Sequence, residues 1–202
     1  MKIISAEFIT SAAAGGTTEG IPRDGLPQIA MAGRSNVGKS TLLNALCRRK
    51  VARTSAAPGK TRLANVYRVT LEGLGPGKRS LYLVDLPGYG YARGGADAAA
   101  ELKAVAEAYF STGSAGALLL VDARHPELES DQSAARWLSA MNVDHRIVAT
   151  KIDKLSRSER ARNMKTLEVT VGMPPVPVSA ASGEGLDALW KTIASLARTG
   201  RA

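Results

Sequence analysis

The sequence predicts an α/β fold, in which a mostly parallel six-stranded sheet carries one antiparallel hairpin and has helices on both faces. Short apolar runs alternate with longer helix-like segments along most of the chain, which favours right-handed crossovers between parallel strands. One pair of runs is instead joined by a Gly- and Pro-rich stretch, "GLGPGKR", which favours a hairpin. With 202 residues, of which 45% are hydrophobic, the chain is large enough to bury the core of one domain.

The expected strands are apolar runs bounded by turn residues, and the expected helices are the longer segments between them. In chain order, strands are predicted at residues 28–33, 64–73, 80–86, 116–122, 145–151 and 174–180. Helices are predicted at residues 39–49, 96–111, 130–142, 156–171 and 185–199. Residues 11–27 are small, polar and turn-forming. Residues 1–27 are therefore expected to form an extended lead-in, and residues 28–202 the folded domain.

The charge and the cysteine content narrow the class of protein. The formal net charge is +9 and the isoelectric point is near 9.9, so a polyanion is a plausible partner. Basic residues gather in the segments 47–62 and 154–165, which could equally be solvated faces. The single cysteine, Cys47, permits no disulfide within the chain, and no run of about 18 apolar residues suggests a membrane span. We expect a cytoplasmic protein that does not contact a membrane.

One motif predicts a phosphate-binding loop. The stretch "GRSNVGKS" follows a predicted strand, precedes a predicted helix and matches Gly-x4-Gly-Lys-Ser/Thr. Such a loop turns successive N–H groups toward a phosphate, while its lysine supplies charge and its last hydroxyl binds Mg²⁺. The alternative is a helix capped by a Gly-rich turn. The candidate nucleotide-binding residues here are Gly33, Arg34, Ser35, Asn36, Val37, Gly38, Lys39, Ser40 and Thr41.

The stretch "DLPGYG" indicates a second part of the same site. Asp85 ends a buried-looking strand and can hold Mg²⁺, commonly through water, whereas Gly88 can offer its N–H to a terminal phosphate. Leu86 and Pro87 are expected beside them. Tyr89 occupies the position at which Ras-type switches carry a water-orienting glutamine, so hydrolysis of a bound nucleotide by the protein alone should be slow. The favoured alternative is that the Tyr89 side chain packs away from the nucleotide.

Two further loops indicate guanine. In "TKID", Asp153 can accept both the N1–H and the amino group of guanine, and Lys151 can lie along the base. In "SAASGEG", the N–H of Ala180 can meet the guanine carbonyl oxygen. Each stretch read alone could be an ordinary loop after a strand. The candidate residues are Thr150, Lys151, Ile152, Asp153, Val178, Ser179 and Ala180.

A third Mg²⁺ ligand is expected in "APGKTR". In GTP-driven switches, a threonine from such a loop completes the metal shell only while the terminal phosphate is present. We favour Thr61 over Thr54 because Thr61 directly precedes a predicted strand. Gly59 and Lys60 are expected beside the nucleotide. The candidate metal ligands are therefore Ser40, Thr61 and Asp85.

The order of these motifs resembles that of one family. The whole chain is similar to the EngB (YihA/YsxC) ribosome-biogenesis GTPases, most specifically in "GRSNVGKS", "PGKTR" and "DLPGYGYA". The stretch "VSAAS" departs from the family pattern, in which an apolar or aromatic residue precedes two serines. The resemblance implies a Ras-like P-loop G domain of the TrmE-Era-EngA-EngB-Septin-like superfamily.

The same resemblance implies partners and a cofactor. They are GTP, GDP and Mg²⁺, and a large ribosomal subunit or its precursor that the protein helps to mature, with a role in cell division. It also implies a monomer off the ribosome and, through "SNVGKS", a K⁺ ion held partly by Asn36. Asn36 could instead bond only within its own loop.

Three functions are compatible with a phosphate-binding loop of this kind. The first is a GTPase switch whose turnover is slow without its partner and whose catalytic group is unknown. The second is a nucleotide-regulated RNA-binding scaffold with negligible hydrolysis. The third, an ATP-dependent kinase, is disfavoured by "TKID" and by the lack of an evident acceptor-substrate site.

Overall fold

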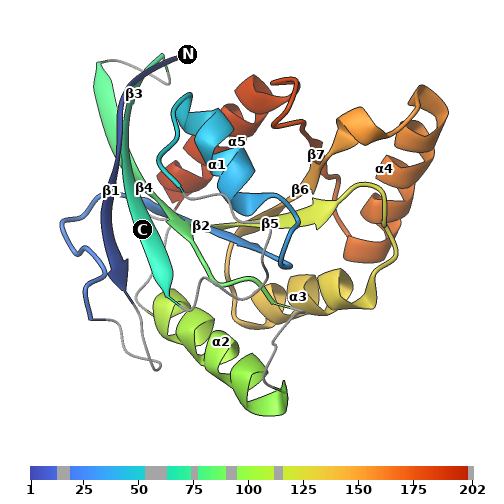
Figure 1. Cartoon of the computed structure of the whole chain (residues 1–202), viewed down its shortest axis with the longest axis horizontal. Coiled ribbons are helices and arrows are strands. Elements are labelled where there is room, and N and C mark those ends of the chain that lie inside the picture. Colours follow the sequence, from blue (N-terminus) through green and yellow to red (C-terminus); the bar gives the residue numbers. More distant parts are fainter. Residues whose placement is uncertain (13–18, 53–62, 74–76, 90–94, 112–115, 200–202) are drawn as a thin grey trace.

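The computed structural model describes residues 1–12, 19–52, 63–73, 77–89, 95–111 and 116–199. It is an α/β fold around one twisted sheet (Figure 1). The strands are β1 (Lys2–Ala12), β2 (Gln28–Gly33), β3 (Ala64–Glu72), β4 (Lys78–Asp85), β5 (Gly116–Asp122), β6 (His145–Thr150) and β7 (Val176–Pro177). The helices are α1 (Lys39–Cys47), α2 (Gly95–Phe110), α3 (Glu129–Ala140), α4 (Arg157–Val171) and α5 (Leu186–Thr199), with a 3₁₀ turn at Ile152–Lys154.

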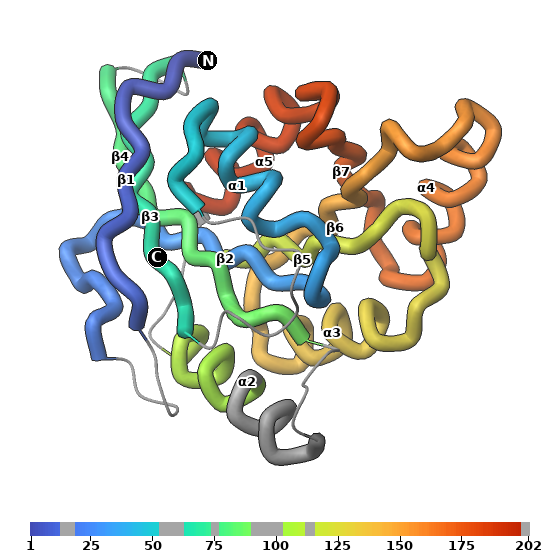
Figure 2. Tube along the Cα trace, viewed as in Figure 1, coloured from blue at the N-terminus to red at the C-terminus, as the bar shows by residue number. Residues whose placement is uncertain are grey.

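The described sheet has seven strands in the order β1-β3-β4-β2-β5-β6-β7, one more than the sequence predicted. Strands β2, β4, β5, β6 and β7 run parallel, and β3 pairs antiparallel with β4 as the expected hairpin. The additional strand, β1, pairs antiparallel with β3 at the edge of the sheet, as Figure 2 shows. It lies within residues 1–27, which the sequence analysis treated as a lead-in.

The sequence signal for β1 is weak for a physical reason. Only Ala6 and Ala12 of this strand are buried, whereas Ile4, Phe8 and Ile9 are exposed. The pairing with β3 is also irregular at two places, between Ile3 and Ser5 and between Phe8 and Thr10. The strand therefore lacks a continuous alternation of buried and exposed side chains.

Two apolar layers cover the sheet, because alternate side chains of each strand point to opposite faces. Along β2, Ile29 and Met31 face a layer formed by α1 and α5, to which Leu43 and Ile193 belong. Ala30 and Ala32 face the other layer, which α2, α3 and α4 cover (Figure 1). Both faces of β2 are therefore buried.

The helix ends agree with local sequence. Ser156 caps α4 in a capping box with Glu159, and Gly172 ends the same helix in a left-handed conformation with φ 77°. In contrast, the N-cap residue of α1 is Gly38, and no side chain caps this N-terminus. Among the described helices, none is long and apolar enough to cross a membrane.

Candidate nucleotide-binding site

The carboxyl ends of four parallel strands meet at one edge of the sheet. Asp85 of β4 pairs with Met31 of β2, and Asp122 of β5 pairs with Thr150 of β6. Gly33, the last residue of β2, pairs with Leu120 of β5. The loops after these strands are therefore side by side (Figure 2). Open parallel sheets bind ligands at such an edge.

The loop between β2 and α1 has the conformation of an anion cradle. Asn36 and Gly38 both have positive φ values, 64° and 107°. Val37 is buried between them, and its carbonyl accepts a hydrogen bond of 2.9 Å from Thr150 Oγ1. The first N–H groups of α1 have no side-chain cap. A phosphate would satisfy these donors and would also meet the positive end of the helix dipole.

Lys39, Ser40 and Asp85 form the charged end of this loop. Lys39 Nζ donates to the carbonyl of Gly33 at 3.3 Å, and Ser40 Oγ donates to Asp85 Oδ2 at 3.3 Å. Burial lowers the pKa of the Lys39 amine, and the charge of Asp85 only partly offsets it. Burial likewise raises the pKa of Asp85, against the opposing effects of Lys39 and Ser40. For both groups, the effect of burial outweighs the attraction between the two charges.

This oxygen set fits Mg²⁺. Asp85 is 3% exposed, and its Oδ1 atom has no hydrogen-bond partner in the described part of the chain. Hydroxyl and carboxylate oxygens are the ligands that Mg²⁺ takes beside phosphates, and Ser40 and Asp85 already lie together. Within the described segments, no group of three His, Cys, Asp or Glu residues forms a separate metal site. The third expected ligand, Thr61, lies outside the described residues, as do Gly59, Lys60 and Thr54.

The segment after Asp85 folds back onto the phosphate loop. The Leu86 N–H donates to the carbonyl of Met31, and the Ser35 N–H donates to the carbonyl of Tyr89 at 3.1 Å. A Cβ atom added to Gly88 would lie 2.9 Å from the Ser35 nitrogen and 3.1 Å from Lys39 Nζ. Only glycine permits this close approach.

The residues expected to recognise guanine lie at the opposite end of the loop. Lys151 Nζ donates to the carbonyl of Asn36 at 2.8 Å, so it bridges "TKID" and the phosphate loop. Asp153 Oδ1 accepts a 2.7 Å hydrogen bond from Ser179 Oγ, which holds the pKa of Asp153 below its ordinary value. Ile152 and Val178 are buried beneath these side chains. The structure therefore brings "TKID" and "SAASGEG" together.

The N–H of Ala180 is not used by any hydrogen bond among the described residues. The loop around it is held instead by the Ser179 N–H, which donates to the carbonyl of Glu184, and by Ser182, whose N–H donates to Ser179 Oγ. Gly185 closes the loop with φ 78°, at a point where an added Cβ would collide with the Pro177 carbonyl. Ala180 thus keeps a donor available for a ligand.

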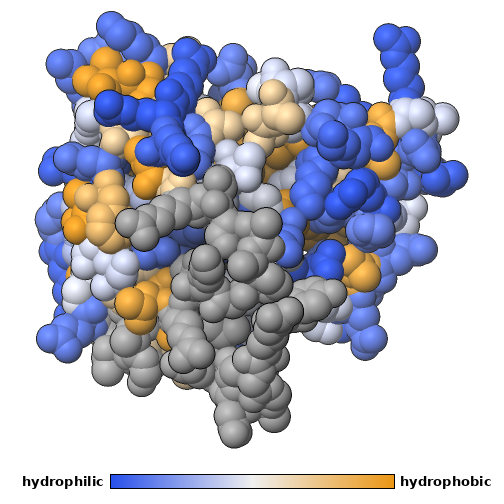
Figure 3. All heavy atoms as spheres, in the orientation of Figure 1, coloured by the Kyte–Doolittle hydropathy of each residue, from blue (hydrophilic) through white to orange (hydrophobic). Residues whose placement is uncertain are grey.

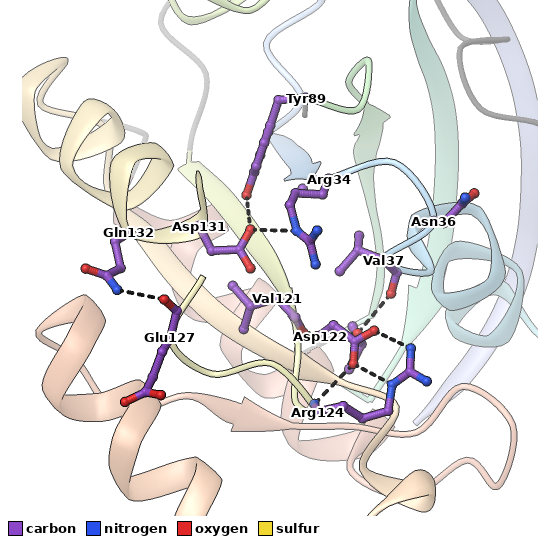
Figure 4. A network of polar contacts seen from close by, with 12 residues as sticks. Arg34, Asn36, Val37, Tyr89, Val121, Asp122, Arg124, Glu127, Asp131 and Gln132 are labelled. Carbon is purple, nitrogen blue, oxygen red and sulfur yellow. Dashed lines mark hydrogen bonds and ion pairs between the residues drawn. The ribbon is translucent and has the colours of Figure 1, made fainter. Parts of the chain in front are cut away.

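Two acidic residues that the sequence analysis did not select complete the site (Figure 4). Asp122 accepts from Lys151 Nζ at 2.9 Å and from Arg124 Nε and Nη2 at 2.9 and 2.8 Å. Burial alone would raise the pKa of Asp122, but the hydrogen bonds from Arg124 and Lys151 hold it below its ordinary value. Asp122 ends the run "GALLLVD" as Asp85 ends "SLYLVD", so its position was a usable signal.

Asp131 is the second of these residues. It lies in the first turn of α3 and is 3% exposed. Tyr89 donates its hydroxyl to Asp131 Oδ1 at 3.0 Å, and Arg34 Nε lies 3.3 Å from the same oxygen. Tyr89 therefore directs its side chain to α3. No spacing in the sequence relates Asp131 to the phosphate loop, because the fold alone makes them neighbours.

Two kinds of similarity identify the family of this chain. A family described as "50S ribosome-binding GTPase" matches residues 28–151. A protein of Pelotomaculum thermopropionicum described as "Probable GTP-binding protein EngB" is 44% identical over 200 residues, which cover 96% of each chain. This chain belongs to the EngB family. Another EngB protein, from Solibacter usitatus, is 41% identical over 196 residues, again with 96% of each chain covered.

Solved structures share the fold of this EngB chain. A crystal structure of a probable EngB protein has a TM-score of 0.65 at 24% identity, covering 85% of this chain and 98% of that one. The structure of Era in complex with MgGDPNP and part of 16S ribosomal RNA has a TM-score of 0.70 at 25% identity. The match covers 85% of this chain and 56% of Era. The expected α/β G domain and the EngB resemblance are thereby confirmed.

Proposed function

We propose that this EngB protein is a Mg²⁺-dependent GTPase switch that assists assembly of the large ribosomal subunit in the cytoplasm, with a consequent role in cell division. The observation that carries the proposal is the meeting of three recognition elements at one sheet edge. Lys39 and the N-terminus of α1 face one end, Asp85 and Ser40 lie together beside them, and Asp153 lies at the other end. Each element matches one part of a guanine nucleotide.

The phosphate end binds charge. Lys39 and the N–H groups at the start of α1 are suited to the β- and γ-phosphates, and Gly88 is suited to meet the terminal phosphate. Ser40, Asp85 and Thr61 would hold Mg²⁺, which neutralises charge that develops on the phosphates during hydrolysis. Asp85 is suited to act through water, because its free Oδ1 is the atom that a metal-bound water could meet.

The guanine end supplies selectivity. Asp153 presents two carboxylate oxygens to adjacent donors, and Ser179 fixes the orientation of that carboxylate. Lys151 is held between Asp122 and the Asn36 carbonyl, so its stem is positioned before the nucleotide binds. Adenine offers no matching pair of donors, so a site of this kind should discriminate strongly against ATP.

One observation favours the second candidate function, a nucleotide-regulated RNA-binding scaffold. The Tyr89 hydroxyl is bonded to Asp131, and no glutamine stands at this position to orient water. Hydrolysis by the isolated protein should therefore be slow under either proposal. The two differ in what a ribosomal partner does to the rate.

The decisive experiment combines binding with turnover. Affinities for GTP, GDP and ATP would be measured with and without Mg²⁺, and GTP hydrolysis would then be followed with and without purified large ribosomal subunits. The switch proposal expects guanine-selective, Mg²⁺-dependent binding of GTP and turnover that the subunits stimulate. Nucleotide-dependent binding to the subunits without stimulation would favour the scaffold instead. Equal affinity for ATP and GTP would contradict both.

A further inference from the structure

Arg34, Tyr89 and the buried Asp131 form a polar cluster beside the phosphate loop, in which Arg34 and Tyr89 are partly buried. One oxygen, Asp131 Oδ1, accepts from the Tyr89 hydroxyl at 3.0 Å and lies 3.3 Å from Arg34 Nε (Figure 4). The other oxygen, Oδ2, is buried without a hydrogen-bond partner among the described residues. Both contacts of the cluster therefore depend on a single carboxylate oxygen.

The cluster connects three parts of the molecule. Arg34 belongs to the phosphate loop, Tyr89 directly follows Gly88, and Asp131 belongs to α3. The main chain adds a second connection, because Arg34 and Tyr89 form a parallel bridge and the Ser35 N–H donates to the Tyr89 carbonyl. Tyr89 is thus fixed at its carbonyl by the phosphate loop and at its hydroxyl by α3.

The position of Tyr89 determines that of Gly88. The glycine lies so close to the loop that one added carbon would be 3.1 Å from Lys39 Nζ and 2.9 Å from the Ser35 nitrogen. The lysine of a phosphate loop reaches the β- and γ-phosphates. A phosphoryl group is larger than one carbon atom, and although the tip of Lys39 can turn aside, the Ser35 nitrogen belongs to the main chain, so a third phosphate cannot lie between Gly88 and the loop in this arrangement. GTP therefore requires Gly88 to move away, whereas GDP has no third phosphate to place there.

We propose that Asp131 is a specificity-determining residue that favours GDP over GTP by holding Tyr89 and Gly88 against the phosphate loop. The inference rests on the proposed binding of guanine nucleotides. Entry of a third phosphate displaces Gly88 and strains the bond between Tyr89 and Asp131. Breaking that bond leaves a buried carboxylate with fewer donors, which is costly. A ligand shifts the equilibrium between two arrangements of a protein only if it binds them with different affinities. The cluster supplies such a difference, because GDP fits the arrangement with Gly88 against the loop and GTP requires the arrangement with Gly88 displaced.

The experiment compares Tyr89→Phe and Asp131→Asn with the wild-type protein. Tyr89→Phe removes only the hydroxyl, while Asp131→Asn keeps the shape but removes the charge that pairs with Arg34. Equilibrium affinities for GDP and for a non-hydrolysable GTP analogue would be measured with Mg²⁺ present. We expect affinity for the analogue to rise relative to GDP by roughly fivefold or more, the usual lower limit of coupling between sites.

The matched control is Tyr82→Phe. Tyr82 is a buried tyrosine whose hydroxyl likewise donates to an aspartate, Asp24 Oδ2, at 2.8 Å, but it lies in the middle of β4. Its loss should lower stability without changing the ratio of the two affinities. Thermal unfolding of all variants would separate a general loss of stability from a change in preference.

The outcomes separate this inference from the proposed function. A wild-type protein that binds neither nucleotide would contradict the proposed function itself. Normal binding by the wild type, with an unchanged ratio in both Tyr89→Phe and Asp131→Asn, would overturn only the role of Asp131. A ratio that shifts equally in Tyr82→Phe would also overturn it, because the effect would then follow from lost stability.

Discussion

Lys151 and Asp122 form an ion pair of 2.9 Å at the base of the guanine end of the site, and the same lysine donates to the Asn36 carbonyl of the phosphate loop. Asp122 is 3% exposed and also binds Arg124 through two hydrogen bonds. A buried carboxylate with two cationic partners fixes both of them. Lys151 is consequently oriented across the loop before any nucleotide arrives.

The first prediction tests this arrangement through Asp122→Asn. The neutral amide cannot hold Lys151 as strongly, so affinity for GDP should fall roughly 10-fold or more, since a hydrogen bond to a charged group contributes about 1.5–3 kcal/mol. Fluorescence titration with a labelled GDP would measure it. Arg146→Ala is a suitable control, because it removes the half-exposed ion pair between Arg146 of β6 and Asp144, which precedes that strand. Unchanged affinity for GDP in Asp122→Asn would mean that Asp122 is not needed to orient Lys151.

The pH dependence of stability gives a second prediction. The pKa of Asp122 is lower in the folded protein than in the unfolded chain. Its contribution is therefore complete above the ordinary aspartate pKa of about 3.9 and is lost only as the pH falls through the lower, folded value. The stability difference between wild type and Asp122→Asn should be the same at neutral pH and at about pH 5.5, and should narrow below about pH 4. Denaturant unfolding over this pH range would measure the difference in the free energy of unfolding. A difference that already narrows above pH 5 would show that a group other than Asp122 is responsible.

Base selectivity provides a third prediction. Asp153→Asn should weaken the binding of GTP by on the order of several kcal/mol. It should favour the binding of xanthosine triphosphate, whose oxygen at position 2 can accept a hydrogen bond from the new amide. Ser179→Ala should weaken GTP less, because it removes only the 2.7 Å hydrogen bond that orients Asp153. Competition binding would rank the nucleotides. Wild-type GTP affinity in Asp153→Asn would contradict the assignment of "TKID".

The basic turn after α1 gives a fourth prediction. Arg48, Arg49 and Lys50 are exposed, and Asn44 holds the turn by accepting from the N–H groups of Val51 and Ala52. If this turn meets phosphates of ribosomal RNA, binding to large subunits should weaken steeply with salt, and charge reversal at these three residues should flatten the slope. Arg53, another basic residue of the segment 47–62, lies outside the described residues.

The matched control for that experiment is charge reversal on the second basic segment. Arg157, Arg162 and Lys165 of α4 are exposed, in a region where Figure 3 shows mainly hydrophilic side chains. GTP affinity should change little in either variant. Equal loss of subunit binding in both would indicate nonspecific attraction, and no loss in the first would mean that the turn is a solvated face.

A fifth prediction concerns monovalent cations. Asn36 is exposed, and its side chain makes no hydrogen bond to its own loop within the described residues, as Figure 4 illustrates. It is therefore available to hold K⁺ against the phosphates, where positive charge would stabilise the transition state. GTP hydrolysis should be faster in K⁺ than in Na⁺ at equal ionic strength, and Asn36→Ala should abolish the difference. Identical wild-type rates in both salts, with and without large subunits, would eliminate this mechanism.

Parts of the molecule differ in how far their sequence determines them. The phosphate loop, Asp85 and "TKID" could be predicted because each combines a short motif with the end of an apolar strand. The edge strand β1 could not be predicted, because a strand that buries only Ala6 and Ala12 shows almost no regular alternation of apolar and polar residues. Asp122 ends an apolar strand, as Asp85 does, but it belongs to no known motif. Asp131 was beyond sequence reasoning, since its partners Arg34 and Tyr89 become neighbours only when α3 packs on the sheet.

The placement of β1 has a consequence for synthesis. The strand is made before its partner β3 (Ala64–Glu72), which follows only after β2 and α1. Until then, a segment that keeps Ile4, Phe8 and Ile9 exposed even in the folded protein stays unpaired. In the folded protein, the two irregularities in its register with β3 interrupt the regular ladder that another chain could extend along this edge. The edge strand of the folded protein is thereby a poor template for strand pairing between copies of the chain.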